Sequence, residues 1–76
     1  MTKDQLHRIL TVICDEHDGD PEESRPNIEI MHGYGQYTVI DATFPAWEIS
    51  GDGILTAHTS SGTYWITCES INCIGI

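Results

Sequence analysis

The sequence predicts an α+β fold in which an N-terminal amphipathic helix packs on an antiparallel sheet of four to five strands. Apolar residues recur at helical spacing up to about residue 18, and from residue 27 onward they alternate with a period of two. Gly, Pro, Ser and Asp separate the alternating segments. With 39% hydrophobic residues in a chain of 76, we expect one small domain over residues 1–76.

The helix is predicted from about residue 3 to residue 18. Thr2 and Gln5 have the spacing of a capping box, in which each side chain bonds the backbone N–H of the other residue. Asp4 and Arg8 stand one turn apart and are able to pair. Gly19 is a suitable left-handed terminator. One face of the helix is formed by Leu6, Ile9, Leu10, Ile13 and His17.

An acidic cluster occupies the end of this helix and the loop of residues 19–26. It holds six acids within nine residues, namely Asp15, Glu16, Asp18, Asp20, Glu22 and Glu23. Acids in the last helical turn face the negative end of the helix dipole, which costs about 0.3–1 kcal/mol each. The cluster contradicts the usual preference for basic residues at a helix C-terminus, and the sequence shows no nearby interaction that compensates for it. Such violations indicate a functional role.

The sheet is expected over residues 27–76. Strands at residues 27–32 and 37–42 flank the turn at residues 33–35, and residues 43–46, with Pro45, interrupt the pairing. Trp47 and Ile49 lead into the turn at residues 50–53, and extended segments follow at residues 54–58 and 63–68. A short break at Ser70 precedes the last apolar segment, residues 71–76.

The second half of the sheet resembles the closing strands of an SH3-like or Sm-like barrel. The features that carry this resemblance are an apolar strand after Trp47, a Gly-Asp-Gly turn, a strand with Gly62, Tyr64 and Trp65, a short break and a final Ile-x-x-Ile. They cover 30 residues, from Trp47 to Ile76. The resemblance implies a curled sheet with the helix over one face or one end.

Charge is the strongest indication of function. The chain has 12 acids against three lysines and arginines, a formal charge of −9, and no lysine or arginine after Arg25. Nucleic acid and anionic membranes repel such a surface, so we expect neither as a direct partner and expect a basic protein surface instead. The expected contact residues are the acidic cluster, supported by Glu29, Glu48, Asp52 and Glu69.

Other chemistries have weaker support, and we expect no enzyme and no bound metal or cofactor. Zinc ligands are available, at poor spacing, from Cys14, His17, Cys68 and Cys73. Buried, reduced thiols are an alternative that accounts for the three cysteines equally well. The acidic loop offers oxygen ligands for Ca²⁺ without the EF-hand pattern. No motif of an activated nucleophile is formed by the candidate pairs, which combine Ser60, Ser61 or Cys68 with His58 or His32. Gly33-Tyr34-Gly35 has no lysine or helix behind it to bind phosphate.

Aromatic side chains and strand edges offer further contact surfaces. The aromatic residues that we consider for exposure are Tyr34, Tyr37, Phe44, Trp47 and Trp65. The alternative is that both tryptophans pack under the helix. Because the predicted sheet carries no lysine to protect its edges, a homodimer formed through an edge is a further alternative.

In size, acidity and lack of catalytic motifs, the chain resembles the small acidic anti-defence proteins of bacteriophages, including anti-CRISPR and anti-restriction proteins. The resemblance covers the full length at the level of class and rests on no shared motif. It implies an inhibitor that blocks a CRISPR effector or restriction complex sterically or as a DNA mimic, in the host cytoplasm. No apolar stretch approaches the ~20 residues that span a bilayer, which also favours a cytoplasmic protein. The alternative is an interaction module, such as an antitoxin, an immunity-type protein or a phage accessory subunit.

Overall fold

The computed structural model of the chain describes residues 1–43 and 46–76, so Phe44 and Pro45, within the predicted break at residues 43–46, lie outside the described residues. The described elements are α1 (Lys3–Glu16), η1 (Glu22–Ser24), β1 (Asn27–His32), β2 (Gln36–Asp41), β3 (Trp47–Ile49), β4 (Ile54–Thr59), β5 (Gly62–Thr67), η3 (Cys68–Ser70) and β6 (Ile71–Gly75). These elements confirm the α+β class.

The expected number of strands was wrong, because the described part of the chain contains six strands rather than four or five. They form two antiparallel sheets of three strands each, in the orders β2-β1-β6 and β3-β4-β5. Strand β3 has only three residues and lies between a break and a turn. A segment that short shows too little alternation to be recognised as a separate strand.

Helix α1 begins as predicted. Gln5 N–H donates to Thr2 Oγ1 at 3.2 Å, and Thr2 N–H donates to Gln5 Oε1 at 3.1 Å, which completes the capping box. The helix ends at Glu16 with His17 as its C-cap, two residues before the predicted end. Gly19 is not a left-handed terminator, since the described residues with positive φ are Gly33, Gly35, Gly53 and Gly62.

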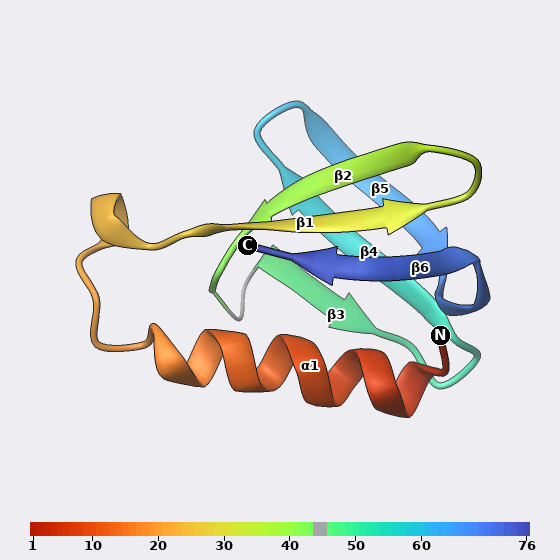
Figure 1. The fold of residues 1–76 in the computed structure, drawn as a ribbon, viewed down its shortest axis with the longest axis horizontal. Helices are drawn as coiled ribbons and strands as arrows, with labels where there is room; N and C mark the ends of the chain where they lie inside the picture. Colours follow the sequence, from red (N-terminus) through yellow and green to blue (C-terminus); the bar gives the residue numbers. More distant parts are fainter. Residues whose placement is uncertain (44–45) are drawn as a thin grey trace.

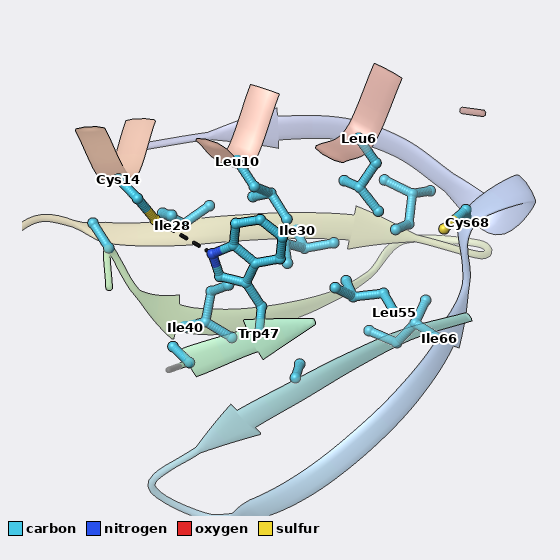
Figure 2. Packing of buried hydrophobic residues seen from close by; sticks show 14 residues of the cluster. Leu6, Leu10, Cys14, Ile28, Ile30, Ile40, Trp47, Leu55, Ile66 and Cys68 are labelled. Atoms are coloured by element: carbon cyan, nitrogen blue, oxygen red, sulfur yellow. Dashed lines mark hydrogen bonds between the residues drawn. The ribbon is translucent and has the colours of Figure 1, made fainter. Parts of the chain in front are cut away.

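The core lies between the two sheets and the helix. Figure 1 shows the strands of β3-β4-β5 crossing those of β2-β1-β6, with α1 running alongside β3 and β6. Each sheet turns alternate residues inward, so Ile28 and Ile30 are fully buried while Glu29 is exposed. Figure 2 shows how these residues meet inside one cluster of 14 buried residues.

The predicted core face of the helix is confirmed for Leu6 and Leu10, and Ile13 packs against the core while partly buried. Leu6, Leu10 and Cys14 are buried, whereas Ile9 and His17 are only half-buried. Residues four apart in a helix lie one above another, so the small Cys14 side chain continues the line of the two leucines. The core is thereby closed on the side that the two sheets leave open.

Trp47 and Trp65 have opposite environments. Trp47 is 7% exposed under the helix, where its Nε1–H donates to Cys14 Sγ at 3.3 Å, as Figure 2 shows. The His7 ring meets the Trp47 ring edge to face, with 5.8 Å between the ring centroids. Trp65 is 70% exposed on the outer face of β5. The packing alternative therefore holds for Trp47 and is wrong for Trp65.

Candidate functional site

The acidic cluster predicted from sequence forms a defined end of the molecule, which we call the acidic end. It contains the six acids at the end of α1, in η1 and in the connection between them: Asp15, Glu16, Asp18, Asp20, Glu22 and Glu23. Figure 1 shows this segment, in orange, at one extremity of the longest axis of the molecule. Five of the six side chains are exposed, and that of Asp20 is half-buried.

Local contacts hold the acidic end in shape. The His17 ring and Asp20 lie 2.8 Å apart, between Nδ1 and Oδ2, and Asp20 N–H also donates to the His17 carbonyl at 3.1 Å. Arg25 then reaches back across the loop: its Nη2–H donates to the Asp18 carbonyl at 3.0 Å and its Nε–H to the Asp20 carbonyl at 3.3 Å. The loop is thus tied to the helix end through its main chain.

Within the described ranges, no carboxylate is paired with a lysine or an arginine. Both Arg25 and Lys3 bond backbone carbonyls, since Lys3 Nζ donates to the Gly51 carbonyl at 2.7 Å. The Asp4–Arg8 pair that the sequence allowed is absent, because the sole ion pair within the described ranges is His17–Asp20. The negative charge of the acidic end therefore faces water almost uncompensated.

The structure does not bring the remaining predicted contact residues to the acidic end as one group. Glu29 is exposed on β1 and Glu48 on β3, in two different sheets. Asp52, in the turn after β3, and Glu69, in η3, lie near the start of α1, at the opposite extremity of the molecule (Figure 1). All four are exposed, so the ten residues fall into separate regions.

Sequence reasoning missed two members of an exposed row on the outer face of sheet β2-β1-β6. Met31 pairs with Tyr37 on one side and with Cys73 on the other. Tyr37 is 67% exposed, and Met31 and Cys73 are exposed as well. The alternation of β1, with Ile30 buried, was the signal that places Met31 outside. The expectation that all thiols are buried was wrong for Cys73.

The cysteines show no arrangement for a metal. Cys14 and Cys68 lie at opposite ends of the core in Figure 2, and all three thiols are free. Within residues 1–43 and 46–76, no three His, Cys, Asp or Glu side chains gather as metal ligands. Burial raises the pKa of the Cys68 thiol, which favours its neutral form over the thiolate that binds metal or attacks a substrate.

His32 and His58 bond threonines rather than the serines or cysteine considered as nucleophiles. His58 Nδ1 lies 3.2 Å from Thr63 Oγ1, and His32 Nε2 lies 3.0 Å from Thr38 Oγ1. A catalytic dyad requires the nucleophile within hydrogen-bond reach of the base. The Gly33-Tyr34-Gly35 turn leads into strand β2 rather than into a helix, so it lacks the helix N-terminus of a phosphate site.

In the part of the chain that the structure describes, no helix has the length and hydrophobicity that a membrane crossing requires. Comparisons of the chain with protein-family models, with curated proteins and with solved structures found no match.

Proposed function

We propose that the chain is a non-enzymatic inhibitor that binds the basic surface of a nucleic-acid-binding protein complex and blocks it sterically or by mimicking nucleic acid. One observation carries the proposal: at a formal charge of −9, two of the three lysines and arginines bond backbone carbonyls, and the carboxylates face water. A surface of one sign steers a protein toward partners of the opposite sign.

The size of the molecule sets how much nucleic acid it can imitate. Its longest extent is 32 Å. B-DNA carries about one charge per 1.7 Å of axis, so a duplex of that length bears roughly 19 phosphates. The nine net negative charges of the chain amount to about half of these. The chain therefore matches one face of a duplex rather than the whole cylinder.

The acidic end is the proposed anchor of this contact. Its exposed carboxylates lie on a loop that Arg25 and the His17–Asp20 pair already hold in place. Preorganisation lowers the conformational entropy that binding would otherwise cost. In this proposal, Asp20 acts mainly through the loop geometry, because its carboxylate bonds His17, while Glu22 and Glu23 contact the partner.

We propose in addition that the chain folds as an SH3-like barrel and that its target is a bacterial CRISPR effector or restriction complex. The order of elements supports an SH3-like barrel: β6 returns through the turn η3 to pair with β1, and β3, β4 and β5 form the second sheet. The resemblance to phage anti-defence proteins supports a bacterial CRISPR effector or restriction complex as the target. The competing proposal, neutralisation of a basic toxin, requires the same charge and differs in the partner recovered.

Affinity capture from bacterial lysate, after nuclease treatment, tests the function. We expect recovery of a nucleic-acid-binding complex that loses its nucleic-acid binding when the chain is added. Recovery of a toxin supports the competing proposal instead. A captured complex that binds the chain and its nucleic acid together, without loss of affinity for either, contradicts both blocking mechanisms.

Two variants with equal charge loss locate the contact. The double variant Glu22→Gln/Glu23→Gln removes two carboxylates from the acidic end, where neither side chain makes a hydrogen bond in the structure. The control, Asp52→Asn/Glu69→Gln, removes two at the opposite extremity. We expect the first to weaken binding by about two- to thirty-fold at low salt, from ~0.2–1 kcal/mol per exposed pair, and the control to have less effect. Equal effects of both variants would place the contact elsewhere.

A further inference from the structure

Strand β2 has a free edge that borders a groove. It pairs with β1 on one side only, since it is the outer strand of the sheet β2-β1-β6. A groove of about 700 Å³ runs beside it. One wall is β2 itself, from Tyr37 to Asp41, and the other is the β4–β5 hairpin, which β2 crosses in Figure 1.

The residues that border the groove show that it follows the edge of β2 rather than one of its faces. Five consecutive residues of β2, Tyr37 to Asp41, line it. Successive side chains of a strand point to opposite faces, so a groove on one face would be lined by every second residue. Consecutive lining is what a groove along the strand edge produces, and among the described strands only β1 pairs with β2, so the N–H and C=O groups on the groove side have no strand partner there.

The chemistry of the groove favours a cationic occupant. Among the described residues that line it, Asp41 is the one acidic residue, and none is a lysine or an arginine. Tyr37 and Tyr64 are 67% and 45% exposed, so their rings are available to an arginine or lysine side chain. Natural sheets commonly protect free edges with lysine, and β2 carries none.

We propose that the free edge of β2 binds an extended, lysine- or arginine-bearing segment of the partner protein, which adds to the sheet β2-β1-β6 as a fourth strand. The identity of this occupant rests on the proposed function, because that function supplies the basic partner. A second copy of the chain fits the edge less well, since two molecules of charge −9 repel each other.

The geometry limits the length and pattern of the bound segment. Strand β2 has six residues, which correspond to about 20 Å of extended chain. A matching segment therefore spans roughly six residues, and backbone hydrogen bonds supply its affinity. Its side chains alternate between the two sides of the sheet, so basic residues at every second position share the outer face with Tyr37 and Asp41, and the residues between them face the β4–β5 hairpin and Tyr64.

The test uses two synthetic peptides, because the natural segment is not identified. The probe is an eight-residue peptide of alternating lysine and valine with blocked ends, and its control has glutamate in place of lysine. Amide hydrogen exchange of the whole chain, read residue by residue by NMR, reports which backbone groups become protected. We expect the lysine peptide to protect alternate amides of β2, those that do not already bond β1, and the glutamate peptide to protect none.

A pair of variants then separates this site from the acidic end. Asp41→Asn removes the carboxylate of the groove, and Asp4→Asn is the control, because Asp4 is exposed in the first turn of α1 and does not line the groove. We expect the first variant to weaken binding of the lysine peptide by about 1.4- to five-fold and the second to leave that binding unchanged. Protection that rises with protein concentration in the absence of peptide would assign the edge to a second copy and overturn the proposal. Peptide effects confined to residues 15–23 would also overturn it, yet leave the proposed function standing.

Discussion

The strongest test of the electrostatic reasoning needs no partner. Asp15 and Glu16 occupy the last turn of α1, which contains no basic residue, whereas Asp4 lies in the first turn. The helix dipole places negative potential at the C-terminal end and positive potential at the N-terminal end. We therefore expect the double variant Asp15→Asn/Glu16→Gln to be more stable than the natural chain and Asp4→Asn to be less stable.

The magnitudes follow from the position of each group. An acid in the last turn costs about 0.3–1 kcal/mol at low ionic strength, so neutralising two of them raises the free energy of unfolding by about 0.6–2 kcal/mol. Asp4→Asn lowers it by about 0.3–1 kcal/mol. In a domain of this size, 1 kcal/mol corresponds to about 4–8 °C in Tm. Helix propensity contributes little, because Glu and Gln, and Asp and Asn, have similar values.

Urea unfolding at about 10 mM and about 1 M salt measures both effects. The Debye length falls from about 30 Å to about 3 Å over this range, so both differences should shrink at high salt. The double variant should at the same time bind its partner less tightly. The reasoning is refuted if the double variant is no more stable at low salt, or if its gain is the same at both salt concentrations.

Three further outcomes follow from burial. An alkylating reagent should modify the exposed Cys73 before the buried Cys68. Burial raises the pKa of Cys68, so the stability that its neutral thiol contributes is present below the ordinary thiol pKa and is lost as pH rises through the raised pKa of the folded chain. Trp65→Phe should remove most of the fluorescence that acrylamide quenches, because Trp47 is buried. Thr11→Val should raise the free energy of unfolding by roughly 1 kcal/mol, since Thr11 Oγ1 is buried without a hydrogen bond and an unpaired buried hydroxyl costs about 1–3 kcal/mol.

A specific result would contradict each of these three predictions. Equal alkylation rates of the two thiols in the folded chain, measured by mass spectrometry of peptides, would mean that Cys68 is accessible. Fluorescence quenching that survives in Trp65→Phe would place Trp47 near the surface. A loss of stability in Thr11→Val, measured by urea unfolding, would mean that the hydroxyl has a partner.

Local patterns predicted the elements better than their arrangement. The capping box at Thr2 and Gln5 and the positive-φ glycines around Tyr34 depend on neighbours in sequence, so a start of the helix and a hairpin turn were readable directly. The division into two sheets was not, because the pairing of β6 with β1 joins residues 39 to 46 apart in sequence, from His32 with Ile71 to Glu29 with Gly75. Sequence periodicity contains no information on which strands pair at such distances.

The acidic end shows the same division. Its six acids are adjacent in sequence, so the cluster itself was predicted, and its location at one extremity follows from the end of α1. The bonds from Arg25 to the carbonyls of Asp18 and Asp20 were not predictable, because a cation beside many carboxylates would be expected to pair with them. The free edge of β2 was equally hidden, since it depends on sheet order.

Charge and periodicity were sufficient to predict the sign of the surface charge, the helix and most of the strands, because both are properties of the chain. Tertiary structure alone decided that Cys14 and Trp47 meet in the core while Trp65 and Cys73 face water. The physical reason is that burial depends on which faces of the elements meet. Two tryptophans, or two cysteines, can therefore differ in exposure, because contacts between segments far apart along the chain bury one of them and not the other.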